Sequence, residues 1–277
     1  MSPQSSAGIT FAKALCAVDG TPDSLVAVGQ AGALTGSDGH VTLLIATAFR
    51  HDPEMRSPEI QPWRASEIVE QARQAASDAG VDASVEVDPG GAPADLISQR
   101  SYEHDLLALG AAATASWFGA MFMSSVTAVA EEDLSTPLLV ARGEGVAPRR
   151  ILIASDGLDV SDGLVELGAE LSARHHADAT LVHVLGAESR AHPHRLERQQ
   201  EQLERLCPSC SQARIEVGKP RNVIVDVARE ADADLIVMSS RRLSGVRTIG
   251  SVSRPVVAHA PCSVLLVPPE LLAAQAA

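Results

Sequence analysis

The chain carries one sequence pattern twice, and this duplication limits the folds it can adopt more than any other feature. The segment 14–20 (ALCAVDG) is similar to 151–157 (ILIASDG), and 104–107 (HDLL) is similar to 233–236 (ADLI). The second set follows the first in the same order, roughly 130 to 140 residues later. The chain is therefore predicted to fold as two copies of one domain.

A short segment, 143–149 (GEGVAPR), lies between the two copies and contains the residues that typically interrupt helices and strands. We predict a first domain over residues 8–142 and a second over residues 149–269. At 277 residues the chain is long enough for two domains that each bury a core.

Within each copy, short aliphatic runs alternate with segments of helical pattern. Strands are expected near 13–18, 41–46, 83–87, 106–109 and 138–141, and again near 150–155, 179–185, 213–217, 235–238 and 263–267. Helices are expected near 23–35, 64–79, 93–100 and 126–135, and again near 161–174, 194–206, 221–231 and 251–259. The alternation predicts an α/β fold in each copy: a five-stranded parallel sheet with helices on both faces. Ligands of such sheets bind beyond the carboxyl ends of the strands.

The composition agrees with aliphatic parallel sheets and argues against polyanionic partners. Hydrophobic residues make up 45% of the chain but aromatic residues only 3%, so Ala, Val, Leu and Ile must build the cores. The net charge of −13 disfavours nucleic acids and anionic membranes. No apolar run has the length of a membrane span, and no secretory signal is visible, so a cytoplasmic location is expected.

The segment 234–268 combines a buried strand, a loop of small and basic residues, a helix start and a second strand. Backbone N–H groups exposed at such a loop and helix start suit an anion, most often phosphate. Its closing part, 250–267 (GSVSRPVVAHAPCSVLLV), resembles the end of a universal stress protein domain. The resemblance extends over nearly the whole chain. It implies flavodoxin/Rossmann-like domains with a flavodoxin-like strand order, whose last strands pair in an intramolecular pseudo-dimer.

In ATP-binding members of that family, this loop carries two glycines and a later Gly-Ser or Gly-Thr pair that hold the phosphates. The resemblance places a nucleotide site in the second copy, on residues Ala154, Asp156, Val184, Met238, Ser239, Arg241, Arg242, Gly250, Ser251 and Val252. Ser239 and Arg242 stand where the family has its first two glycines, and the loop before Gly250 is shorter than in the family. Either the arginines compensate, because their forked side chains match phosphate oxygens, or they surround a pocket that has lost its nucleotide.

The corresponding residues of the first copy are Asp19, Ala46, Gly110, Ser124 and Ser125. Here the loop 111–123 (AAATASWFGAMFM) is apolar and contains no cationic side chain that could meet phosphates. Such a loop packs against a neighbouring domain or protein, or fills the core. We therefore expect a weaker nucleotide site in the first copy than in the second.

Other polar residues have simpler interpretations beside the functional ones. Asp19 and Asp156, which the resemblance places beside the adenine, each precede a glycine, as turn and helix-capping residues do. Cys207 and Cys210 form a C-x-x-C pair with His192 and His194 upstream, which is a weak signal for redox or zinc chemistry. We assign no metal site and expect no metal beyond Mg²⁺ that accompanies ATP.

The sequence thus leads to two hypotheses from different classes. The first is a tandem universal stress protein: a cytoplasmic stress-response regulator that binds ATP mainly in its second domain and has at most a very weak ATPase activity. The second is a protein-interaction module of the same fold that needs no nucleotide. A protein partner of unknown identity and a possible homodimer are compatible with both, and neither involves nucleic acid or a membrane.

Overall fold

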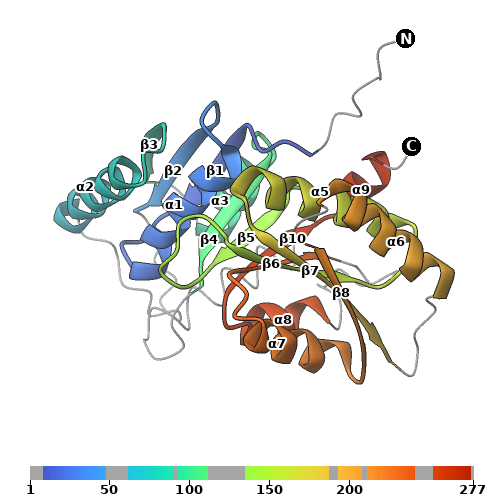
Figure 1. Cartoon of the computed structure of the whole chain (residues 1–277). Coiled ribbons are helices and arrows are strands. Elements are labelled where there is room, and N and C mark those ends of the chain that lie inside the picture. The colour runs from blue at the N-terminus through green and yellow to red at the C-terminus, as the bar shows by residue number, and fades with distance from the viewer. Residues whose placement is uncertain are drawn as a thin grey trace, which may run out of the picture. The chain divides into compact units, whose positions relative to one another are not determined.

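A computed structural model of the chain shows two compact units, Phe11–Ala147 and Pro148–Ala277, each described here by itself. Figure 1 shows their strands and helices. The structure describes residues 9–47, 62–89, 93–111, 135–186, 193–207, 211–240 and 252–275.

The first domain is a parallel sheet of five strands in the order β3-β2-β1-β4-β5. Its strands are β1 (Lys13–Ala17), β2 (His40–Ala46), β3 (Ala83–Asp88), β4 (Leu106–Gly110) and β5 (Leu138–Ala141). Its helices are α1 (Pro22–Thr35), α2 (Pro62–Asp78) and α3 (Pro93–Ser101). The helix predicted near 126–135 lies largely outside the described residues.

The second domain repeats this arrangement in the order β8-β7-β6-β9-β10, again with parallel neighbours. Its strands are β6 (Arg150–Ser155), β7 (Asp178–Leu185), β8 (Ser211–Val217), β9 (Leu235–Ser239) and β10 (Ser263–Val267). Its helices are α5 (Val160–His175), α6 (Pro193–Leu206), α7 (Pro220–Glu230), α8 (Ser253–His259) and α9 (Pro269–Gln275). Helices α5, α6 and α9 lie on one face of this sheet, and α7 and α8 lie on the other (Figure 1).

The predicted α/β class and the duplication are confirmed, but the expected flavodoxin-like strand order is wrong. In flavodoxin-like sheets the third strand lies between the first and the fourth, whereas here β3 is at the edge and β1 pairs directly with β4. The difference matters for the site. The strand order changes direction between β1 and β4, so the topological switch point lies at the carboxyl ends of these two strands. The second domain has the same switch point beyond β6 and β9.

The burial of the strands explains why they could be predicted from aliphatic runs in the sequence. Every residue of β4, β5 and β10 is buried, as expected for aliphatic parallel strands that are covered on both faces. Helix α9 was not predicted. It covers α5, where Leu272 is fully buried and an added Cβ at Gly163 would lie 2.6 Å from the Leu272 carbonyl oxygen. No helix among the described residues is both long and apolar enough to cross a membrane.

Candidate functional site

The candidate site of each domain lies at its topological switch point. Two loops start there: the loop after the first strand (β1 or β6) and the loop after the fourth strand (β4 or β9). In the second domain, Ala154 on β6 is the register partner of Met238 on β9, so Asp156 and Ser239 follow neighbouring strand ends. In the first domain Ala17 is the partner of Leu109, which places Asp19 and Gly110 in the same way. The structure therefore places Asp156 beside Ser239 and Asp19 beside Gly110, at the start of the loops that the sequence assigned to the site.

Val184 and Ala46 lie on the next strand outward, β7 and β2 respectively. Val184 is buried and Ala46 is half-buried at the last residue of β2, where it is the register partner of Asp88. Their positions fit the predicted base-lining role and a plain core role equally, because both are apolar side chains near the carboxyl end of the sheet.

Both predicted aspartates are engaged in the turns that they begin. Asp156 Oδ1 accepts hydrogen bonds from Leu158 N at 3.1 Å and from Ser161 Oγ at 2.7 Å. Asp19 Oδ1 accepts from Thr21 N at 3.0 Å and from Thr21 Oγ1 at 2.6 Å. The turn interpretation thus accounts for Oδ1 of each carboxylate, whatever else the carboxylates bind.

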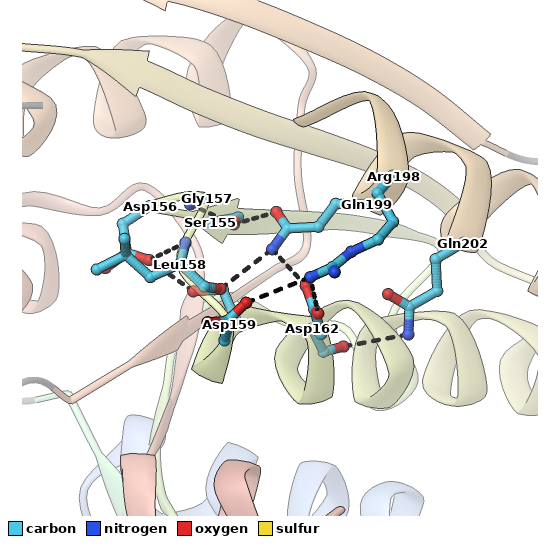
Figure 2. Close-up of polar contacts among 10 residues, drawn as sticks. Ser155, Asp156, Gly157, Leu158, Asp159, Asp162, Arg198, Gln199 and Gln202 are labelled. Atoms are coloured by element: carbon cyan, nitrogen blue, oxygen red, sulfur yellow. Dashed lines mark hydrogen bonds and ion pairs between the residues drawn. The ribbon is translucent and has the colours of Figure 1, made fainter. Parts of the chain in front are cut away.

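A buried glutamine holds the first loop of the second domain in place. Gln199 on α6 is fully buried: its Oε1 accepts from Ser155 Oγ at 2.6 Å, and its Nε2 donates to Asp162 Oδ1 at 2.8 Å and to Leu158 O at 3.3 Å. Ser155 Oγ in turn accepts from Gly157 N at 3.0 Å. Figure 2 shows these contacts converging on the loop from α6.

Other polar and charged side chains of α6 lie beside the contact between Gln199 and Asp162. Arg198 donates to Asp162 Oδ2 and lies 3.5 Å from Asp159 Oδ1, and Gln202 Nε2 donates to the Asp162 carbonyl at 3.4 Å (Figure 2). Asp162 therefore accepts hydrogen bonds from three polar side chains of α6, those of Arg198, Gln199 and Gln202. The sequence analysis did not identify Gln199; the available signal was a polar residue three positions after Leu196, on the apolar stripe of the helix.

In the first domain, an aliphatic side chain of α2, Ile68, takes the place that Gln199 has in the second domain. An added Cβ at Gly20, whose φ is +79°, would lie 2.9 Å from Ile68 Cγ1 and 3.1 Å from Gln71 Oε1, both on α2. Ile68 is 2% exposed. Helices α2 and α6 both begin at a proline, and Ile68 and Gln199 occupy the same position after it.

The residues that end the fourth strands differ in what surrounds them. In the first domain, an added Cβ at Gly110 would lie 2.4 Å from Ser24 N and 2.5 Å from the Asp23 carbonyl carbon, so the start of α1 occupies that space. In the second domain Ser239 supplies a side chain there. Its Oγ is buried and has no hydrogen-bond partner within the described part of the chain.

Arg241, Arg242, Gly250, Ser251, Ser124 and Ser125 lie outside the described residues. Val252 is described: it precedes the first residue of α8, with backbone angles in the right-handed helical region.

The cysteine pair gains no support from the described residues. Cys207 is buried, His194 is exposed and lies 3.5 Å from Glu197, and His192 and Cys210 lie outside the described residues. Burial raises the pKa of the Cys16 thiol, which suits a structural core residue. Over the described ranges, no cluster of three or more His, Cys, Asp or Glu side chains is placed to hold a metal ion.

Comparison with known proteins identifies the family. The profile described as "Universal stress protein family" matches residues 10–142 and again residues 148–268. A universal stress protein of Synechocystis is 46% identical over 55 residues, which span 19% of this chain and 36% of that protein. A putative universal stress protein of Staphylococcus aureus is 42% identical over 66 residues, which span 23% of this chain and 40% of that protein. The chain thus matches well under half the length of these curated relatives.

Solved structures show the same fold over nearly the whole chain. A universal stress protein from Archaeoglobus fulgidus has a TM-score of 0.71 at 19% identity, covering 94% of this chain and 97% of that one. A putative universal stress protein from Pseudomonas aeruginosa has a TM-score of 0.66 at 16% identity, covering 96% of each chain. Because the family profile matches both halves, the chain belongs to the universal stress protein family and carries two copies of its domain.

Proposed function

We propose that this protein is a cytoplasmic stress-response regulator whose second domain binds an adenine nucleotide, with ATP as the leading candidate. The observation that carries the proposal is the Ser239 hydroxyl, which is buried at the β6/β9 switch point without a partner within the described residues. A buried hydroxyl that makes no hydrogen bond is costly, so a ligand that bonds to it would repay that cost.

The proposed roles follow from the position of each residue along the sheet. Ala154, Val184 and Met238 form apolar walls for the base, and Asp156 accepts from its amino group. Ser239 and Val252 lie on either side of the loop that would hold the phosphates, to which Arg241, Arg242, Gly250 and Ser251 belong. Mg²⁺ would enter with ATP. Two other universal stress proteins have solved structures in complex with cAMP and with dAMP, so these nucleotides belong in the test beside ATP.

The first domain is the weaker candidate. At Gly110 the start of α1 lies where a ligand would have to approach the backbone closely. The following loop, 111–123, offers no cation. We propose that Asp19, Ala46, Gly110, Ser124 and Ser125 bind nucleotide less tightly than their counterparts, or not at all.

Isothermal titration with ATP, dAMP and cAMP tests the assignment directly. Ser251→Leu should weaken binding at least tenfold by placing an apolar side chain at the phosphates, whereas the matched Ser125→Leu should leave the affinity unchanged. Ser239→Ala should weaken binding by about fivefold while leaving the free protein at least as stable, because it removes an unpaired buried hydroxyl. Equal losses from Ser125→Leu and Ser251→Leu would contradict the choice of domain.

A specific observation supports the alternative, a nucleotide-independent interaction module. The outer strands carry exposed apolar side chains: Val87 on β3 is 48% exposed, and Ile215 and Val217 on β8 are 59% and 80% exposed. Exposed apolar residues on edge strands favour contacts with another protein or with a second copy of this chain. No heat of binding and no rise in unfolding temperature up to millimolar ATP would favour this alternative, because a ligand that binds only the folded state must stabilise it.

A further inference from the structure

Strand β8 is the outermost strand of the second domain's sheet, because it pairs with β7 alone among the described strands. Gly218 N donates a backbone hydrogen bond to Leu185 O on β7. The backbone groups of successive residues in a strand point to alternate sides, so those of Ala213, Ile215 and Val217 point away from β7. Their N–H and C=O groups face the outer side of the strand, where a further strand could pair with them.

The side chains of the same three residues form an apolar stripe, the β8 stripe, on the face of the sheet that α6 covers. Ala213 and Ile215 border a cavity of about 190 Å³ together with Leu196 of α6. Ile215 and Val217 are 59% and 80% exposed, so α6 does not cover the stripe. Exposed apolar side chains beside outward-pointing backbone groups favour the addition of another strand.

The two charged residues of β8, Arg214 and Glu216, project from the opposite face. The guanidinium of Arg214 lies 2.9 Å from Glu216 Oε1 and 3.0 Å from Glu230 Oε2 on α7. The side chains of Arg214 and Glu216 are 35% and 33% exposed, so a molecule that approaches the edge can reach both. A guanidinium has five N–H donors, so Arg214 can bind a further carboxylate beside these two.

We propose that β8 pairs in antiparallel orientation with β8 of a second copy of this chain, about a twofold axis centred on Ile215. In this register Ile215 lies opposite Ile215 of the partner subunit, and Ala213 lies opposite the partner's Val217. All three residues point outward, so each exchanges backbone hydrogen bonds with the residue opposite. The two β8 stripes meet on one face of the joined sheet and remove each other's apolar side chains from water. A twofold contact of this kind requires an edge that complements itself.

The charges of β8 select this register. A pairing centred on Arg214 would place Arg214 opposite itself, and one centred on Glu216 would place Glu216 opposite itself. Like charges directly opposite each other are unfavourable. Only the pairing centred on Ile215 places Arg214 opposite the partner's Glu216, and the symmetry forms this pair twice. Both pairs fall at positions that exchange no backbone hydrogen bonds, where the side chains of antiparallel strands lie closest.

The first domain has an equivalent edge without these charges. Strand β3 is its outermost strand, and Val87 is exposed there at the position that strand register matches to Ile215. The charged residues of β3, Glu86 and Asp88, are both acidic and are bound by Arg100 of α3. No pairing of β3 with its own copy can place opposite charges of the strand against one another. The proposed contact therefore belongs to the second domain.

This contact is independent of the nucleotide proposal. Strand β7 lies between β8 and the switch point at β6 and β9, so pairing at the edge does not involve the candidate nucleotide site. A second copy of the chain fits the edge because the charge pattern of β8 complements itself.

Sedimentation equilibrium of the full-length protein, in about 0.15 M salt to screen its net charge, tests the dimer. The weight-average mass should rise from 28.9 kDa toward twice that value as the concentration increases. Arg214→Glu and Glu216→Arg each place like charges opposite one another at both pairs, so each should weaken dimerisation at least about tenfold. Mixed in equal amounts, the two variants should form a heterodimer about as tight as the wild-type dimer, because each subunit then faces opposite charges.

The mixing experiment separates the contact between subunits from contacts within a chain. Mixing leaves each variant chain with its own altered contacts, so a heterodimer can only come from charges that meet across the edge. Wild-type protein that stays monomeric up to about 0.5 mM would overturn the proposal. Variants that dimerise as tightly as the wild type, or that fail to associate when mixed, would overturn it as well.

Proline at matched edge positions locates the contact. Ile215→Pro removes an outward-pointing N–H and no hydrogen bond to β7, so it should abolish the dimer while the far-ultraviolet circular dichroism stays unchanged. Val87→Pro, at the register counterpart on β3, should leave dimerisation as in the wild type. A dimer that survives Ile215→Pro would contradict the proposal, and one lost only in Val87→Pro would assign the contact to the first domain. Nucleotide affinity should stay the same in all four variants, so either proposal can fail without the other.

Discussion

The two domains close the same loop with opposite chemistry. In the first domain the second helix presents Ile68 to the glycine turn after β1, and in the second domain the same helix position presents Gln199 to the loop after β6. Both side chains are almost fully buried, at 2% and 0% exposed. The backbone arrangement therefore does not require an apolar contact at this position. A buried amide serves as well when each of its polar atoms finds a partner.

The fourth strands differ in a related way. Gly110 in the first domain leaves room for the start of α1, whereas Ser239 in the second domain occupies the corresponding place with a side chain whose hydroxyl has no partner among the described residues. The glycine of the first domain is thus explained by helix packing alone. A glycine at this strand end is not by itself a sign of a phosphate site.

Exchanging these two residues should produce the largest effect. Gly110→Ser should lower the free energy of unfolding of the first domain by about 3 kcal/mol, because the new Cβ would collide with backbone atoms that cannot rotate away. The reverse change, Ser239→Gly, should alter the second domain by less than about 1 kcal/mol. Both tryptophans, Trp63 and Trp117, belong to the first domain, so tryptophan fluorescence during urea unfolding reports on Gly110→Ser, and circular dichroism during the same unfolding also reports on Ser239→Gly in the second domain. Similar effects of the two changes would contradict the packing explanation.

A smaller effect is expected from removing the buried amide. Gln199→Leu should lower the stability of the second domain by about 2 kcal/mol, since Ser155 Oγ loses its acceptor and Asp162 loses a donor. The matched change in the first domain, Ile68→Leu, should cost less than about 1.5 kcal/mol because it exchanges one aliphatic side chain for another. Circular dichroism during urea unfolding measures both. A Gln199→Leu variant as stable as the wild type would show that the hydrogen bonds contribute nothing net.

The ends of the first helices offer a third comparison. Gly36 follows α1 with φ +76° and ψ −174°, a conformation that only glycine adopts readily, and Gly36→Ala should cost about 1.5 kcal/mol. His176 follows α5 in the left-handed region with φ 52°, where a side chain is strained, so His176→Gly should stabilise the second domain by about 1 kcal/mol. Thermal unfolding of the two variants shows whether each change lowers or raises the unfolding temperature. A destabilised His176→Gly protein would indicate that the imidazole makes contacts that outweigh the strain.

The smallest effect should be a pH dependence confined to the second domain. Burial, and then the charges of Arg174 and His176, lower the pKa of His175 below its usual value of 6.5, whereas α1 ends in Thr35, which does not titrate. The unfolded chain then binds the proton more readily. Stability contributed at His175 is present above about pH 6.5 and is lost as the pH falls through the lowered folded-state pKa.

The variant His175→Gln isolates this contribution. The wild-type second domain should lose more stability than the variant between about pH 7.5 and pH 5.5, as measured by circular dichroism during urea unfolding. Burial raises the pKa of Glu170 on the same helix, which acts in the opposite sense, so the difference between wild type and variant is the quantity to compare. An identical pH dependence in the two proteins would contradict the prediction.

Much of this architecture could be predicted because it depends on local pattern. Strands such as β9 and β10 were predicted to within one residue, since buried parallel strands are continuous aliphatic runs. The turn role of the two aspartates, one of two alternatives that the sequence left open, is confirmed, because Asp-Gly pairs hydrogen-bond their own backbone. The arginines and the Gly-Ser pair of the candidate phosphate loop stay predictions, as they lie outside the described residues.

The sequence by itself determined that the chain folds as two parallel α/β domains, because duplication, aliphatic periodicity and turn residues are properties of neighbouring positions. Only the tertiary structure decided that β1 pairs with β4, that Gln199 reaches Ser155 and that Ser239 Oγ is left without a partner among the described residues. Hydrophobic pattern tells which side chains leave water. It does not tell which residues distant in the sequence those side chains contact. The chemistry of both candidate sites depends on these long-range contacts.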